Sequence, residues 1–219
     1  YTTTARPDWD WAKEQITQIE IQNDVTKVGS RAFSGMNAVE NITVADSVTS
    51  FSDCAFLGCG IKDKTVLHFG KGLASIPEGS STAKGALRYN TVAKFEVDEA
   101  NPYFKTSADG ILYTKDGKEL VAYPMGKSDT TFHSDWLDGV EAIRSGAFFG
   151  ATFTSPENIV IPDSVKKIGE QAFSAALTDK NSNFKIHLSN NLETIEANAF
   201  KSAKFYGAIK LGEKLTSIA

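Results

Sequence analysis

The sequence predicts a solenoid of stacked coils, in which each coil adds a short strand to a common sheet and turns close the other side. The first observation is a motif ending in Ala-Phe, as in SVKKIGEQAF at residues 164–173, which recurs at five places. The second is the distance between copies, which is 23 to 27 residues outside one long interval. Repeats of this length are typical of solenoids, because a coil can bury its apolar side only against its neighbours.

Each repeat opens with an aliphatic residue, called the anchor below. A second apolar residue lies three positions later, and two more lie six and four positions earlier. Apolar residues at every second position are the mark of a half-buried strand. The anchors are Val25, Val48, Leu73, Val140, Val165, Leu192 and Leu215. The earlier pairs are Ile19 and Ile21, Ile42 and Val44, Leu67 and Phe69, Ile159 and Ile161, Ile186 and Leu188, and Ile209 and Leu211.

The motif itself predicts a structural core. We expect the anchor and the residue three positions on to point inward, and the Phe to fill the centre of its coil. The small Ala before it would let a neighbouring backbone or ring pass close. The rings would then stack as an aromatic column, which needs no catalytic explanation. The column comprises Phe33, Phe56, Phe148, Phe173 and Phe200.

The interval from Leu73 to Val140 spans 67 residues and predicts an enlarged coil. It holds no Ala-Phe copy, but ILYTKDGKELVAY places alternating apolar runs on both sides of Asp116-Gly117. Asp-Gly between such runs predicts a β-hairpin, since both turn positions favour positive φ. We therefore expect a strand-rich insertion continuous with the sheet. Just before Val140, the segment TFHSDWLDG is expected to form a strand whose register the pattern defines only to within one residue.

Composition limits the possible functions. The 219 residues are 41% hydrophobic and 23% charged, with a net charge of −4, as in ordinary soluble chains. Lysines and arginines are scattered without a basic stripe, which argues against a nucleic-acid partner. No apolar run predicts a transmembrane segment in this portion. Since the chain starts at Tyr1 without a basic and apolar leader, we expect a signal peptide to have been removed or the chain to be an excised piece.

The chain contains two cysteines, Cys54 and Cys59. Cys59 follows its Phe by three residues, where other copies place Met36 or alanine. We interpret Cys59 as a small buried thiol rather than a ligand or nucleophile, because two cysteines without paired histidines do not make a zinc site. A disulfide between the two stays an open alternative.

The repeat and the insertion together resemble the BspA type of leucine-rich repeat, named after a bacterial surface protein A. The resemblance rests on IVIPDSVKKIGEQAF, NITVADSVTSFSDCAF and NPYFKTSADGILYTKDGKELVAYP, and covers residues 14–219. It implies an α/β leucine-rich-repeat solenoid with right-handed coils, one continuous sheet, and short helical or irregular turns opposite it. It also implies a secreted or surface-attached protein, without enzymatic activity or cofactor, that mediates adhesion to a host or to other cells.

We expect a single domain over residues 1–219. Its parts are an N-terminal cap with the first strand (1–24), repeats (25–76), an enlarged coil with the hairpin (77–139), and repeats that stop midway through a motif (140–219). In the cap, Trp9 and Trp11 are expected to cover the open side of the first coil. An exposed pair would instead suggest a platform for stacking sugars.

The side chains between the two inward residues of each strand are expected to face solvent, about 4.8 Å apart from coil to coil. This mostly polar ladder is the predicted recognition surface. Its members are Gln18, Glu20, Asn41, Thr43, Val66, His68, Asn158, Val160, Lys185, His187 and Lys210. The expected partner is an extracellular host or microbial protein, and a glycan is the alternative.

Neither catalysis nor metal binding is predicted. His68 and His187 lie in non-adjacent coils and lack a third ligand, so both are interpreted as solvent-facing strand residues. His133 and Asp135, two positions apart, are only a weak candidate for an acid-base pair.

Two carbohydrate hypotheses remain beside protein recognition. A polysaccharide-active parallel β-helix also stacks coils, but it needs clustered carboxylates on adjacent coils, whereas Glu20 and Lys210 lie at opposite ends of the ladder. Carbohydrate binding without chemistry would use exposed aromatic rings. The candidates are Trp9, Trp11, Tyr103, Tyr113 and Tyr123.

Overall fold

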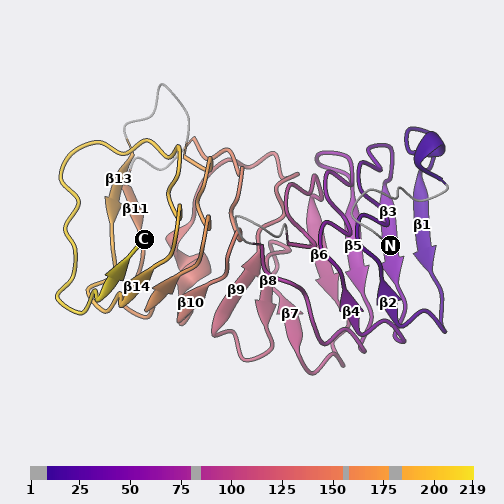
Figure 1. Ribbon diagram of the computed structural model, residues 1–219, viewed down its shortest axis with the longest axis horizontal. Helices are drawn as coiled ribbons and strands as arrows, with labels where there is room; N and C mark the ends of the chain where they lie inside the picture. The colour runs from indigo at the N-terminus through magenta and orange to yellow at the C-terminus, as the bar shows by residue number, and fades with distance from the viewer. Residues whose placement is uncertain (1–8, 80–84, 155–157, 178–183) are drawn as a thin grey trace.

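The computed structural model describes residues 9–79, 85–154, 158–177 and 184–219, so the first eight residues of the predicted cap and part of the predicted enlarged coil lie outside the described residues. The coils stack along one axis from β1 at the N-terminal end to β13 and β14 at the C-terminal end (Figure 1). The strands are β1 (Gln18–Ile21), β2 (Lys27–Val28), β3 (Asn41–Val44), β4 (Ser50–Phe51), β5 (Val66–Phe69), β6 (Lys94–Val97), β7 (Phe104–Thr106), β8 (Leu112–Thr114), β9 (Glu119–Ala122), β10 (Ala142–Ile143), β11 (Asn158–Val160), β12 (Lys167–Ile168), β13 (Lys185–His187), β14 (Thr194–Ile195) and β15 (Ser217–Ile218).

The sheet is not continuous, contrary to expectation. The longer strands before the anchors form a four-stranded sheet, β1-β3-β5-β6, and a separate pair, β11-β13. The short strands after the anchors form a pair, β2-β4, and join β7, β8 and β9 of the enlarged coil in the seven-stranded sheet β15-β14-β12-β10-β9-β8-β7. A coil therefore contributes two strands, because both apolar pairs of the repeat face the interior and both flanks of the coil are extended.

The predicted register of the first sheet agrees with the structure. Ile19 pairs with Ile42, Ile42 with Leu67, and Leu67 with Phe95, all in parallel. These four side chains are at most 7% exposed. The alternation in the sequence thus buries one apolar side chain per coil at the same position along the strand. Burial of one face of the sheet therefore fixes the pairing register of the strands.

The helical turns implied by the α/β assignment are not found. Within the described residues the helical segments are two short 3₁₀ turns, η1 (Asp10–Ala12) and η2 (Ser134–Leu137). The residue two positions before the Phe has positive φ in several coils, including 58° at Arg31 and 57° at Gln171, which breaks a right-handed helix. The backbone instead bonds between coils, as where Phe173 N–H donates to the carbonyl of Ala199 at 2.7 Å.

The aromatic column is divided in two. Phe33 stacks on Phe56 with ring centroids 5.6 Å apart, and Phe173 stacks on Phe148 at 4.9 Å and on Phe200 at 5.3 Å. The enlarged coil separates the two stacks, so the expectation of one column along the whole solenoid is wrong.

Two variants of the Ala-Phe motif lie between the stacks. Phe56 N–H donates to the carbonyl of Ala86 at 3.0 Å, and Tyr123 N–H donates to that of Ala147 at 2.9 Å. Both bonds repeat the contact that Phe33 N–H makes with Ala55 at 2.9 Å. Ala86-Leu87 and Ala122-Tyr123 therefore occupy motif positions in the enlarged coil. The sequence pattern missed them because neither carries Phe.

The predicted hairpin lies between the N-terminal and the C-terminal core clusters. β8 and β9 pair antiparallel across Asp116-Gly117, and β9 pairs in parallel with β10. One side of the hairpin packs into the N-terminal core through Leu112, Val121 and Ala122. The other side packs into the C-terminal core through Ile111, Tyr113, Leu120 and Tyr123. Because both sides are buried, the insertion completes both cores.

The segment before Val140 is not a strand. Residues Ser134–Leu137 form η2, and Trp136 is 7% exposed with its ring 5.3 Å from Tyr123 and 5.7 Å from Phe132. The bulky indole occupies the aromatic interior where other coils place an aliphatic side chain. This turn leaves β6 and β11 without a strand between them in the longer-strand series.

A row of alternating charges crosses the seven-stranded sheet. Glu141 lies 2.7 Å from Lys118 and 2.7 Å from Lys166, each in an adjacent coil. Hydrogen bonds from these lysines lower the pKa of Glu141 from 4.5 to about 2. A lowered native pKa contributes stability that is present above about pH 4.5 and is lost as the pH falls toward 2.

We therefore expect Glu141→Gln to reduce the acid sensitivity of folding. The wild-type chain should lose more of its melting temperature between about pH 5 and pH 2 than the variant, because only the wild type must protonate Glu141. Thermal unfolding followed by circular dichroism at several pH values measures this difference. Glu14→Gln, which changes an exposed carboxylate near the N-terminus, is the matched control. Parallel curves for wild type and Glu141→Gln would contradict the assigned contacts.

Candidate recognition surface

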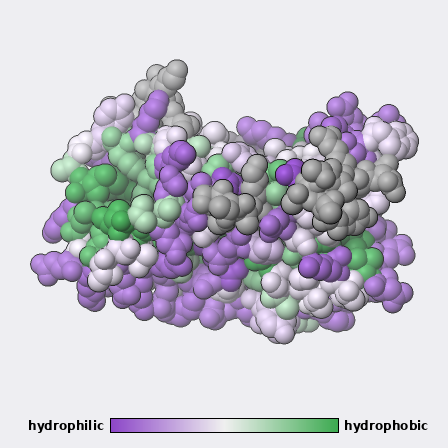
Figure 2. All heavy atoms as spheres, viewed as in Figure 1, coloured by the Kyte–Doolittle hydropathy of each residue, from purple (hydrophilic) through white to green (hydrophobic). Residues whose placement is uncertain are grey.

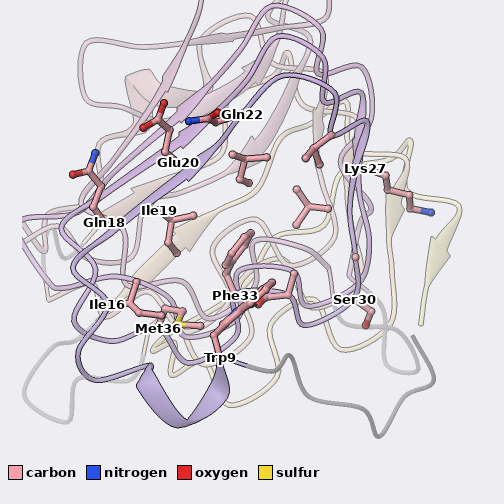
Figure 3. A pocket seen from close by; sticks show the side chains of 15 residues that line it. Trp9, Ile16, Gln18, Ile19, Glu20, Gln22, Lys27, Ser30, Phe33 and Met36 are labelled. Atoms are coloured by element: carbon pink, nitrogen blue, oxygen red, sulfur yellow. Dashed lines mark hydrogen bonds between the residues drawn. The ribbon is translucent and has the colours of Figure 1, made fainter.

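The four-stranded sheet presents two rows of outward side chains, together called the four-strand face. Direct strand pairing joins Glu20, Thr43 and His68 in one row. The same pairing joins Gln18, Asn41 and Val66 in the other. Figure 3 shows the side chains of Gln18 and Glu20 pointing away from the interior, while Ile19 points into it. The structure thus brings together six of the predicted surface residues.

The enlarged coil extends both rows by one strand. Lys94 pairs with Val66 and Glu96 pairs with His68 on β6. These two residues are not among the predicted ones, because β6 lies inside the long interval between repeats. The alternation of Phe95 and Val97 around Glu96 is the signal that could have found them.

Glu96 links side chains on β5 and β6, at one edge of the face. Its carboxylate accepts a hydrogen bond from Lys94 Nζ at 2.6 Å, and its other oxygen lies 2.9 Å from His68 Nδ1. The hydrogen bond from Lys94 is the main cause that lowers the pKa of Glu96. The side chains of His68 and Glu96 are each 38% exposed, so the cluster is accessible to a partner. A charged group held from two sides loses little conformational freedom on binding, which favours recognition.

Two adjoining shallow hollows lie where these strands end. One, of about 450 Å³, is lined by Thr43, Asp46, His68, Glu96 and Asp98 among others. The second, of about 490 Å³, includes Glu20, Asn23, Asp24 and Thr43. Asp46 pairs with Lys71 at 2.7 Å, and this contact lowers the pKa of Asp46. The face is therefore polar, contoured and rich in fixed charges.

The remaining predicted residues do not join this face. Asn158 pairs with Lys185 and Val160 with His187 on the separate β11-β13 pair, called the two-strand patch below. Lys210 is exposed and lies outside any strand. The expectation of one continuous ladder is thus wrong, because the η2 turn interrupts the strand series.

Among the described residues, His133 does not form the predicted pair with Asp135. His133 Nε2 lies 3.5 Å from Asp129 Oδ2, and its ring lies 5.0 Å from that of Trp136, so its ion pair is with Asp129 rather than with the predicted Asp135. Among the residues that the structure describes, no group of three or more His, Cys, Asp or Glu side chains could hold a metal ion. Cys54 and Cys59 are buried and form no disulfide, and burial raises the pKa of Cys59 to about 12, which keeps that thiol protonated.

Two of the five aromatic candidates for sugar stacking are buried, and the other three are exposed. Tyr113 and Tyr123 are 8% and 3% exposed. Trp9 stacks on Phe33 with centroids 5.8 Å apart, as a column ring would. Trp11 is 79% exposed and Tyr103 is 52% exposed. The two tryptophans therefore differ in position: Trp9 stacks on the first ring of the column, whereas Trp11 faces solvent.

The stacked parallel coils and the outward polar rows define a β-solenoid repeat protein. A profile described as "BspA type Leucine rich repeat region" matches six copies, over residues 10–84 and 131–219. The chain belongs to this BspA-type leucine-rich repeat family. The unmatched segment between these ranges holds most of the enlarged coil.

Solved structures agree with this assignment. The pneumococcal vaccine antigen PcpA is 25% identical, with a TM-score of 0.66 over 85% of this chain and 42% of its own. A leucine-rich cell surface protein from Faecalibacterium prausnitzii A2-165 is 19% identical, with a TM-score of 0.64 over 93% of this chain and 55% of its own. The chain therefore spans about half the length of these two proteins. A comparison with curated protein sequences finds no match.

No helix within the described ranges is long and apolar enough to span a bilayer.

Proposed function

We propose that this chain is part of an extracellular or cell-surface protein that recognises another protein, from a host or from other microbial cells, and does so without catalysis. The observation that carries the proposal is the four-strand face, where Lys94, Glu96 and His68 hold a fixed charge cluster beside Thr43 and Glu20. Family membership supports it, since extended solenoids commonly present such surfaces to partners.

The enlarged coil is part of the proposed surface. β6 supplies Lys94 and Glu96, and the hairpin behind it is packed against both cores. A rigid support of this kind keeps the cluster in place before binding, which reduces the entropy lost on association.

Binding assays with two matched variants test this function. The chain is screened against extracellular matrix proteins and a glycan panel, with Thr43→Asp/His68→Asp altering the four-strand face. The control is Val160→Asp/His187→Asp, which makes the same kind of change on the two-strand patch. We expect the first variant to weaken binding of a protein partner at least about tenfold, or about 1.4 kcal/mol, and the control to leave it unchanged.

Three results would contradict the proposal. Binding that is lost only in the control variant would move recognition to the two-strand patch. Turnover of any glycan in the panel would show an enzyme, and glycan binding that excludes all protein partners would favour the carbohydrate hypothesis.

A further inference from the structure

His68 lies on β5, an inner strand of the four-stranded sheet. Its direct strand partners are Thr43 on β3 and Glu96 on β6. The chain has three histidines, and the other two lie elsewhere, His187 on the two-strand patch and His133 beside η2. Imidazole is the one side chain whose ordinary pKa lies between about pH 5 and 8. A change of pH within this range therefore alters the charge of the four-strand face at His68.

Three side chains form a small charge cluster on this face: Lys94, Glu96 and His68. Glu96 Oε1 accepts a hydrogen bond from Lys94 Nζ at 2.6 Å, and Glu96 Oε2 lies 2.9 Å from His68 Nδ1. Because this contact keeps a proton on Nδ1, the other ring nitrogen, Nε2, is the atom that gains or loses a proton. The three side chains are 38% to 44% exposed, so each is partly enclosed by its neighbours.

The charge balance of this cluster depends on His68. With a neutral imidazole, the charges of Lys94 and Glu96 cancel. With a protonated imidazole, one carboxylate faces two cations, and a positive charge is left over. A partner that covers the cluster removes it from water, and burying an uncompensated charge costs more free energy than burying a balanced pair. The neutral form of His68 is therefore the form that favours docking.

The other groups that surround His68 leave this balance unchanged near neutral pH. Its neighbour on β3, Thr43, is uncharged. Asp46 and Asp98 line the same hollow from the turns that follow β3 and β6, and both are exposed residues. Asp46 is paired with Lys71 at 2.7 Å. The hydrogen bond from this lysine lowers the pKa of Asp46, so that carboxylate stays ionised.

Asp98 bonds within its own turn, where its Oδ1 accepts the backbone N–H of Ala100 at 2.8 Å. Figure 2 shows mainly hydrophilic residues along the lower edge of the molecule, toward which the strands of the four-stranded sheet point in Figure 1. Carboxylates in water ordinarily stay ionised above about pH 5. The hydrogen bond from Lys94 lowers the pKa of Glu96, so Glu96 also keeps its charge. Of these groups, the imidazole of His68 is thus the one that titrates near neutral pH.

We propose that His68 makes recognition by the four-strand face dependent on pH, so that its neutral form accepts a protein partner and its protonated form releases it. This regulation rests on the proposed function and acts on the same surface. Because a complex with a neutral imidazole holds fewer protons than the free chain, its affinity falls as the pH falls. One linked proton changes the affinity by up to about tenfold per pH unit.

Binding at two pH values tests this regulation. The probes are immobilised fibronectin, laminin and collagen, at about pH 7.5 and about pH 5.5 and at constant ionic strength. We expect the wild-type chain to bind one of them at the higher pH and to lose about tenfold in affinity at the lower pH. His68→Gln, which stays neutral, should lack this loss and also reports any titration of the partner itself. Circular dichroism at both pH values checks that each chain stays folded.

Lys94→Gln separates charge balance from a general effect of a histidine. Without the lysine, the cluster is balanced when His68 is protonated and has an excess negative charge when His68 is neutral. We expect this variant to bind more tightly at about pH 5.5 than at about pH 7.5, the reverse of the wild type. His187→Gln, which removes an imidazole from the two-strand patch, is the matched control and should keep the wild-type dependence on pH.

Four results would overturn this regulation. Wild-type affinity that is equal at both pH values, or that rises on acidification, would contradict it and leave the proposed function in place. A loss on acidification that persists in His68→Gln would assign the titration to another group. A Lys94→Gln chain that weakens on acidification as the wild type does would contradict the charge balance. Binding at neither pH would remove the proposed function and its regulation together.

Discussion

Replacing Phe173 with alanine is expected to lower the free energy of unfolding by about 3–5 kcal/mol. Phe173 is fully buried, and its ring is stacked between Phe148 at 4.9 Å and Phe200 at 5.3 Å. Removing the middle ring of a stack leaves a cavity bounded by two rings and by the coils on either side, and close-packed coils can collapse only partly into it. Urea denaturation followed by circular dichroism measures the change.

Phe33→Ala is the matched control for this prediction. The same motif position lies there in the first coil, but Phe33 is only partly buried. We expect a clearly smaller loss than for Phe173→Ala, because less area returns to water. Equal losses at both positions, or a loss below about 1 kcal/mol at Phe173, would contradict the central role assigned to the stack.

Replacing Asn101 with alanine is expected to lower the free energy of unfolding by about 3 kcal/mol or more, because several buried groups lose their partners at about 1–3 kcal/mol each. Asn101 is fully buried. Its amide nitrogen donates to the carbonyls of Gly70 and Leu73, both at 3.0 Å. Its side-chain oxygen accepts from the N–H groups of Tyr103 and Phe104 at 2.8 and 2.9 Å.

This side chain connects the third coil to the insertion, so its loss should affect both. Thermal and urea unfolding of Asn101→Ala measure the effect, and Asn23→Ala, at an exposed position, is expected to change stability by less than about 0.5 kcal/mol. An Asn101→Ala chain as stable as the wild type would show that the insertion is held by the hairpin alone.

The strands were predictable because their signal is local. Ile42 and Val44 alternate with Asn41 and Thr43, and that period alone fixes which side chains are buried. The hairpin was predictable for the same reason, since Asp116-Gly117 sets the turn. The sequence analysis included Asn101 only as the first residue of the segment NPYFKTSADGILYTKDGKELVAYP. Two of its four hydrogen bonds reach the carbonyls of Gly70 and Leu73, which lie 31 and 28 residues away and which a local pattern does not encode.

The features that could not be predicted from the sequence depend on packing between coils. Ala86-Leu87 and Ala122-Tyr123 occupy motif positions that only the inter-coil hydrogen bonds reveal. At Trp136 a strand was predicted and a turn was found. The alternating pattern there suggests a strand, but the chain forms a turn that buries the large indole ring against Phe132 and Tyr123.

The candidate face could be predicted only in part. The outward positions on β1, β3 and β5 followed from alternation. The contact of His68 with Glu96 did not, because 28 residues and an insertion separate them and their pairing is set by how the enlarged coil rejoins the sheet.

Histidine footprinting tests the proposed recognition surface most directly. A reagent that acylates exposed imidazoles is applied to the chain alone and to its complex with a protein partner found in the binding screen, and each site is quantified by mass spectrometry. His68 lies on the four-strand face, while His187 on the two-strand patch and His133 near η2 serve as internal references. We predict protection of His68 alone in the complex. Full labelling of His68 with protection of His187 or His133 would contradict recognition through the four-strand face.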